Sequence, residues 1–146
     1  HLPIANGDKA SQEGKILDLF EDTHSELLVL ARYMQILSPG ACAQLAGRAI
    51  NIHHSFLPGF KGARPYQQAF DRGVKLIGAT AHYVTTNLDE GPIIEQDVTR
   101  VDHTMPPREL ERLGQDVEST VLARAVRGHA LHRVFGHDSR TIIMRH

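Results

Sequence analysis

The chain has 146 residues, including ten histidines and one cysteine, and its 16 basic and 17 acidic side chains give a net charge of −1. This length suits one domain, and 41% hydrophobic with 23% charged residues is typical of a globular protein. The balanced charge argues against a nucleic-acid-binding surface, and no apolar run reaches the roughly 20 residues of a membrane-spanning helix. The lone Cys42 favours a reducing, cytoplasmic setting.

Hydrophobic patterning predicts alternating helices and strands in the first half of the chain. Asp8 is expected to cap a first helix, whose apolar stripe lies at residues 16–20. The continuous apolar run 27–31 is typical of a strand that is buried on both faces, as in a parallel sheet. A short helix is expected to start at residues 38–40, and residues 49–52 predict a second buried strand.

The second half of the chain follows the same alternation but adds a hairpin. We expect, in order, a loop at residues 55–65, a short helix at 66–72, strands at 75–86 and 93–99, a long helix capped by Thr104, and an edge strand at 140–144. The two long strands are joined by a short turn, which predicts antiparallel pairing between them. Buried strands separated by helices indicate an α/β fold with a mostly parallel sheet flanked by helices.

The second buried strand ends in two polar residues, at the position where α/β sheets bind their ligands. Asn51 and His53 flank Ile52, so their side chains point to the same side of the strand. An amide and an imidazole placed together can both donate hydrogen bonds to one oxygen, which suits the oxyanion that forms when a carbonyl becomes tetrahedral. The alternative is structural, with Asn51 holding the following loop and His53 satisfied within the core.

An aspartate lies in the turn between the two long strands. Asp89 could serve as a general base if it is buried beside an imidazole, or it could form the turn by accepting backbone hydrogen bonds. His82 lies on the strand that leads into this turn. A catalytic His82 and a buried His82 bonded to a backbone carbonyl or to Asp89 are both compatible with the sequence.

The histidine content raises the question of a metal site, for which His53, His54, His82 and Asp89 are the candidate ligands. The sequence has no His-Glu-x-x-His motif, and its single cysteine excludes a thiolate cluster. His53 and His54 are adjacent in a strand-like segment, so we expect their side chains to point in opposite directions. We therefore expect no metal site. A separate cofactor is not expected either.

Three segments resemble motifs of the folate-dependent formyltransferase family, and they occur in the family's order. Residues 51–58, Asn-Ile-His-His-Ser-Phe-Leu-Pro, resemble its Asn-x-His-x-Ser-Leu-Leu-Pro signature. Residues 88–92, Leu-Asp-Glu-Gly-Pro, resemble its catalytic aspartate loop, and residues 32–38, Arg-Tyr-Met-Gln-Ile-Leu-Ser, resemble its folate-binding segment. The resemblance implies a formyltransferase-type, Rossmann-like fold.

Within the family, the doubled histidine and residues 73–84 and 91–98 are most similar to the hydrolytic members. This similarity implies hydrolysis of 10-formyltetrahydrofolate to tetrahydrofolate and formate, with the formate serving purine synthesis. Two alternatives stay open. One is a phosphoribosylglycinamide formyltransferase or another formyltetrahydrofolate-dependent transferase, and the other is an inactive folate-binding fragment.

The residues and the resemblance together suggest a role for each polar group. We expect Asp89 to orient and deprotonate the attacking water, directly or through a relay, while Asn51 and His53 bind the oxyanion. His53 could also pass a proton to the leaving nitrogen, with His82 and His54 in support. By resemblance, the folate would lie between two segments, Met34, Gln35, Ile36 and Leu37 in one and Thr85, Thr86, Asn87 and Leu88 in the other.

The resemblance also implies how the chain is organised. Residues 1–146 are expected to form a formyltransferase-like catalytic domain without the family's first strand and helix, and without the small ACT-type domain that precedes it in hydrolytic members. The expected partners are the folate substrate and further copies of the chain in a homo-oligomer, and neither nucleic acid nor a membrane.

Overall fold

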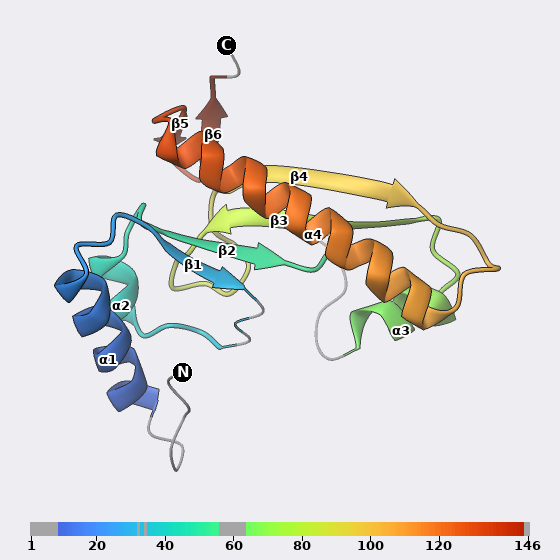
Figure 1. Cartoon of the computed structure of the whole chain (residues 1–146), viewed down its shortest axis with the longest axis horizontal. Helices are drawn as coiled ribbons and strands as arrows, with labels where there is room; N and C mark the ends of the chain where they lie inside the picture. The colour runs from blue at the N-terminus through green and yellow to red at the C-terminus, as the bar shows by residue number, and fades with distance from the viewer. Residues whose placement is uncertain (1–8, 32, 34, 56–63, 145–146) are drawn as a thin grey trace.

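The structure is a computed structural model that describes residues 9–31, 33, 35–55 and 64–144 (Figure 1). The alternation of helices and strands is confirmed over these ranges, whereas the expected cap Asp8 lies outside them. The elements in chain order are α1 (Lys9–Asp22), β1 (Leu28–Ala31), α2 (Pro39–Gln44), β2 (Ala49–His53), α3 (Pro65–Asp71), β3 (Leu76–Tyr83), β4 (Ile93–Arg100), α4 (Pro107–Ala130), β5 (Val134–His137) and β6 (Arg140–Ile143).

The main sheet has the strand order β1-β2-β3-β4 and is mixed. β1 and β2 are parallel, but β2 pairs antiparallel with β3, and β3 pairs antiparallel with β4. The prediction of an α/β fold is confirmed, and the prediction that its sheet is mostly parallel is wrong for the described strands. A continuous apolar strand reports burial of both its faces, not the direction of its neighbours.

The short helix α3 explains this change of direction. A parallel connection needs a helix that runs back along the sheet, whereas the seven residues of α3 span only roughly 10 Å. α3 packs beside the starting end of β3 and the first turns of α4 (Figure 1). The chain therefore enters β3 from the end at which β2 finished.

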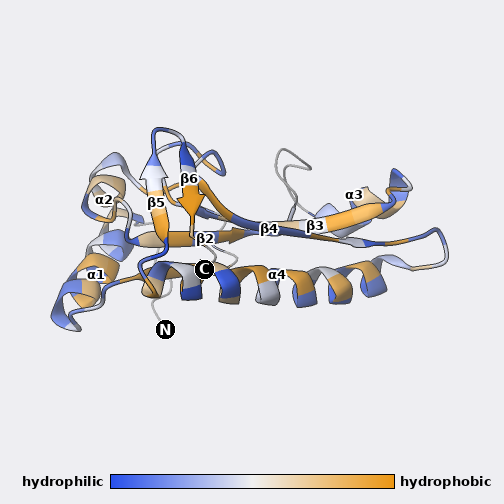
Figure 2. Ribbon diagram, turned by 90° about the horizontal axis from the view of Figure 1, so that it is seen from above, coloured by the Kyte–Doolittle hydropathy of each residue, from blue (hydrophilic) through white to orange (hydrophobic). Residues whose placement is uncertain are grey.

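α4 runs along one side of the sheet and buries its apolar face there (Figure 2). No helix among the described residues combines the length and apolar character needed to cross a membrane. The buried cluster between α4 and the strands consists of Ile50, Ile52, Ala79, Ala81, Ile94, Val121 and Ala125.

Side-chain alternation then decides what the opposite face of the sheet carries. Because the apolar residues at positions 50, 52, 79 and 81 face α4, their neighbours Asn51 and His53 on β2 and Thr80 and His82 on β3 face away from it. α1 and α2 pack near the β1 edge, around Phe20 and Leu45. The face that α4 leaves uncovered is thus lined by polar side chains in the middle of the sheet.

Two further predictions for the second half of the chain are wrong. The strand at Arg140–Ile143 is not an edge strand of the main sheet, because it forms a separate hairpin with β5. Thr104 does not cap the last helix, because α4 has Pro106 at its N-cap and the Thr104 hydroxyl instead donates to Asp102. The first error concerns the sheet that a strand joins, and the second concerns the end of a helix. The hydrophobic period carries no information on either.

Candidate active site

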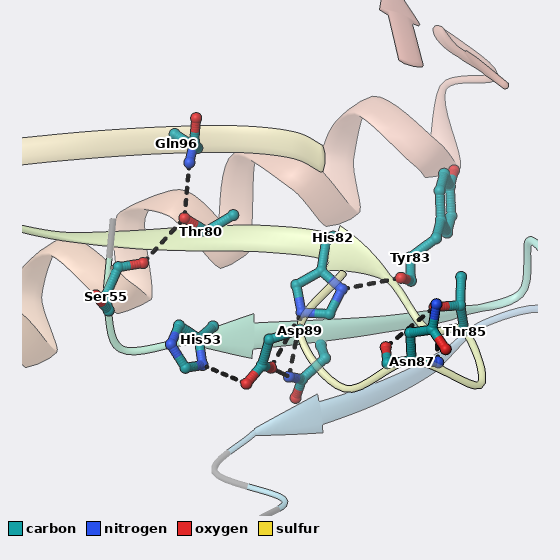
Figure 3. A network of polar contacts seen from close by, with 10 residues as sticks. His53, Ser55, Thr80, His82, Tyr83, Thr85, Asn87, Asp89 and Gln96 are labelled. Carbon is teal, nitrogen blue, oxygen red and sulfur yellow. Dashed lines mark hydrogen bonds and ion pairs between the residues drawn. The ribbon is translucent and has the colours of Figure 1, made fainter. Parts of the chain in front are cut away.

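Four polar side chains meet on the sheet face that α4 leaves uncovered (Figure 3). Asn51 and His53 come from β2, His82 comes from β3, and Asp89 comes from the turn between β3 and β4. The antiparallel register places His82 directly opposite Asn51. All three residues on the strands are buried, with 8% or less of their surface exposed. Strand pairing, rather than the meeting of parallel strand ends, therefore assembles the cluster.

The Asp89 carboxylate is the centre of this cluster. Its Oδ2 lies 3.2 Å from His53 Nδ1, and its Oδ1 lies 3.5 Å from His82 Nε2. The amide nitrogen of Asn51 donates to Oδ1 at 3.5 Å. The backbone of Asp89 has a φ of 55°, a left-handed conformation that aspartate tolerates better than most residues. The sequence-predicted residues are thus brought together around one carboxylate.

Hydrogen bonds determine which imidazole nitrogens carry protons. The His82 Nδ1–H donates to the carbonyl of Tyr83 at 2.9 Å, so a neutral His82 has its lone pair on Nε2, 3.5 Å from the Asn51 amide nitrogen. His53 has its Nδ1–H directed to Asp89, which leaves the lone pair on Nε2. This Nε2 atom is buried and has no hydrogen-bond partner among the described residues.

The protonation of His53 follows from its surroundings. Burial lowers the pKa of His53, since a charged imidazole is poorly solvated there. The Asp89 carboxylate acts in the opposite direction, but it does not outweigh burial together with the repulsion from His54 and His82. His53 is therefore neutral near pH 7, and its free Nε2 can accept a proton.

The sequence predicted that His54 points away from His53, and this prediction is wrong. The two rings stack, with their centroids 4.8 Å apart and their planes inclined by 25°. The prediction assumed that the strand continues, but β2 ends at His53 and the chain bends at His54. The described residues include no group of three histidine, cysteine or acidic side chains arranged to hold a metal ion.

Two residues that are not among the predicted site residues hold this bend in place. The hydroxyl of Thr80 on β3 donates to the carbonyl of Ser55 at 2.9 Å, and Gln96 on β4 donates to the same hydroxyl at 2.9 Å (Figure 3). Thr80 is fully buried and pairs with His53 across the strands. Only the register of the sheet could have identified this contact, because 25 residues separate its partners.

The two predicted folate segments border the same cluster. A small cavity of about 20 Å³ lies between them, which is room for roughly one water molecule. Thr86 is not part of the cavity wall, and Met34 lies outside the described residues. The residues of the two segments that line the cavity, beside Asn51, His82 and Asp89, are Gln35, Ile36, Leu37, Thr85, Asn87 and Leu88.

Comparisons with known proteins identify the family to which the chain belongs. The formyl transferase family model matches residues 6–126. A curated relative from a Corynebacterium species, named formyltetrahydrofolate deformylase, is 54% identical over 99% of this chain and 51% of its own length. A relative of the same name from Mycobacterium tuberculosis is 57% identical over 98% of this chain and 46% of its own length.

Solved structures give the same result. The crystal structure of formyltetrahydrofolate deformylase from Burkholderia mallei superimposes with a TM-score of 0.93 and 61% identity, over 99% of this chain and 52% of that one. Glycinamide ribonucleotide transformylase 1 from Symbiobacterium toebii superimposes with a TM-score of 0.88 and 30% identity, over 97% of this chain and 67% of that one. The chain spans about half the length of the curated relatives it matches. With its fold, its motifs and the family model in agreement, the chain belongs to the formyl transferase family.

Proposed function

We propose that the chain hydrolyses 10-formyltetrahydrofolate to tetrahydrofolate and formate, and that the formate serves purine synthesis. The observation that carries the proposal is His53, a buried imidazole with one nitrogen on a carboxylate and the other free to activate water. The choice of water over an amine acceptor is supported by 54–57% identity to proteins named formyltetrahydrofolate deformylase, against 30% for the transformylase.

In the first proposed step, water attacks the formyl carbon. Nε2 of His53 takes one proton from the water, and Asp89 stabilises the imidazolium that forms by accepting its Nδ1–H. Asp89 thus acts through a relay, which is one of the two routes that the sequence analysis allowed. His53 is then positively charged only after the attack has begun, when the substrate oxygen has become negative.

The oxyanion needs a hydrogen-bond donor, for which Asn51 is the candidate. Among the described residues, its amide nitrogen has two hydrogen-bond contacts, both at 3.5 Å. Bonds of this length are weak, so the amide can turn toward a stronger acceptor. The loss of one such donor typically lowers the rate by about 10²- to 10³-fold. In the resting state His53 has no proton on Nε2, so Asn51 is the principal donor in this proposal.

In the last proposed step, the carbon–nitrogen bond breaks and the His53 imidazolium returns its proton to the departing nitrogen. The water oxygen remains in formic acid, which loses its second proton and becomes formate. The two products are a neutral amine and a carboxylate. Every step uses side chains of the chain itself, so the proposal includes neither a metal nor a separate cofactor.

We propose that residues 1–146 form a catalytic domain that works as a homo-oligomer in the cytoplasm. Self-association is favoured by Phe135 and Ile142 on the β5–β6 hairpin, which are each 51% exposed and apolar. The cytoplasm is favoured by Cys42, a buried cysteine that forms no disulfide.

Formate release without an acceptor tests the proposed reaction. The purified protein is incubated with 10-formyltetrahydrofolate and no amine, and formate and tetrahydrofolate are expected to appear in equal amounts. Release that requires added glycinamide ribonucleotide would point to a transferase instead. A folded sample, judged by circular dichroism, that releases nothing in either assay would point to a folate-binding protein without activity.

The pH dependence tests the role of His53. The proposed base must be unprotonated, and burial lowers its pKa. We therefore expect kcat/KM to stay constant as the pH falls through 6.5, the usual pKa of histidine. Activity should be lost only below that pH. An NMR titration of the His53 ring gives the same pKa directly. A ring that titrates at or above 6.5 would contradict the assignment.

A further inference from the structure

A second cavity, of about 470 Å³, lies between α3 and the first turns of α4 and plays no part in the proposed steps. Its wall includes His54, Arg64 and Arg108, whereas Asn51 and Asp89 do not line it. The volume is that of a ligand site rather than of a packing defect. The charged groups in its wall indicate what it can bind.

The carboxylates of this wall already have hydrogen-bond donors. The Tyr66 hydroxyl donates to Glu118 at 2.7 Å, and the Gln115 amide donates to Glu111 at 3.5 Å. A side chain at Gly114 would prevent the first of these bonds, because its Cβ would lie 2.0 Å from the Tyr66 hydroxyl oxygen. Both carboxylates keep their negative charge, but each already accepts a hydrogen bond from a neutral donor of the protein.

The guanidinium groups of the wall are free by comparison. Within the described part of the chain, neither Arg64 nor Arg108 has a hydrogen-bond or ion-pair acceptor for its side chain. Arg112, one turn further along α4, pairs with Asp116 on the exposed surface. Arg108 also lies in the first turn of α4, where the helix dipole disfavours a positive charge. Among the described residues of this wall, the two guanidinium groups are therefore the donors without an acceptor, and they suit an anion.

His54 connects this cavity to the reaction centre. It lines the cavity, and its ring stacks on His53, the proposed base. Its Nε2 atom is buried without a hydrogen-bond partner among the residues described. An anion in the cavity can accept a hydrogen bond there if Nε2 carries the proton. The cavity is thus separated from the site of hydrolysis by one imidazole ring.

We propose that this cavity is a carboxylate site that receives formate after hydrolysis and releases it, an inference that rests on the proposed function. Formate would form beside the negative Asp89, which repels it. The tetrahydrofolate product closes the side of the folate segments until it leaves. Arg64 and Arg108 attract the anion to the opposite side, where a guanidinium binds a carboxylate through two parallel hydrogen bonds.

Formate binding tests the site without any turnover. ¹³C-labelled formate is titrated into the intact protein and its Kd is taken from the NMR line width, and product inhibition by formate gives Ki separately. The variant Arg64→Met/Arg108→Met is expected to raise both constants by at least tenfold. Arg108→Lys keeps the charge but loses the planar guanidinium, so it should raise them by a smaller factor. Arg112→Met, with the same change on the same helix, should leave both constants unchanged.

The outcomes separate this inference from the proposed function. If the protein hydrolyses the folate, but wild type and the folded double variant have the same Kd and Ki for formate, the carboxylate site alone is overturned. Arginine-dependent formate binding by a protein that releases no formate from the folate would remove the proposed function and leave the site standing. Displacement of formate by inorganic phosphate at lower concentration would show that the cavity selects phosphate, and would overturn the assignment to formate.

Discussion

Asp89→Asn is expected to lower kcat by about 10³- to 10⁴-fold and to leave the protein folded. The carboxylate accepts the Nδ1–H of His53 at 3.2 Å, which keeps the lone pair of His53 on Nε2. An asparagine can present its NH₂ group to Nδ1 instead, so that the proton moves to Nε2 and the base is lost. It also cannot stabilise the imidazolium that forms when water attacks. The measurement is the single-turnover rate of formate release.

Asp97→Asn is the matched control for this variant. Asp97 lies on β4 and pairs with Arg124 at 2.9 Å on the exposed surface, so its loss changes the same charge without touching the cluster. Its turnover should remain within twofold of wild type. Turnover of Asp89→Asn near the wild-type rate would contradict the assignment of Asp89. In the Asp89→Asn variant, the pKa of His53 should be lower still, since the carboxylate is the group that raises it.

Gly91→Ala is expected to destabilise the protein by about 3 kcal/mol and to abolish most activity. A Cβ at this position would lie 1.7 Å from the carbonyl oxygen of Tyr83 and 3.1 Å from His82 Nδ1. The Tyr83 backbone cannot easily withdraw, because its N–H donates to Pro92 at 2.9 Å. The same carbonyl orients His82 by accepting its Nδ1–H. The alanine must therefore push the turn that carries Asp89 away from β3.

Urea unfolding followed by circular dichroism measures this loss of stability. Gly40→Ala is the control, because a Cβ there has no atom within 4 Å and the residue lies in helix α2, where alanine is favoured. It should be neutral or stabilising by up to about 1 kcal/mol. A Gly91→Ala protein within 1 kcal/mol of wild type would mean that the turn does not pack on β3 as described.

The local patterns of the sequence predict the elements well. The long final helix expected after Thr104 spans Pro107–Ala130, and the strands around the Asp89 turn pair antiparallel as expected. The common orientation of Asn51 and His53 follows from strand alternation alone. These features depend on residues that lie a few positions apart, and a hydrophobic period or a motif relates residues over that distance.

The contacts that complete the site depend on the path of the whole chain. His82 meets Asn51 because β2 and β3 are antiparallel, and a buried strand does not reveal the direction of its neighbour. Thr80 reaches Ser55 over 25 residues, and Tyr66 reaches Glu118 over 52. No periodicity records such pairings.

The sequence by itself thus determined the family, the elements and the residue types of the candidate site, since each of these depends on motifs or patterns within short segments. The tertiary structure decided how these residues are arranged. It brought Asn51, His53 and His82 around the carboxylate of Asp89 and stacked His54 on His53 where β2 ends. It also left Arg64 and Arg108 beside a cavity without acceptors among the described residues. The reason is physical, because strand register and helix packing are set by burying the apolar surfaces of distant segments together.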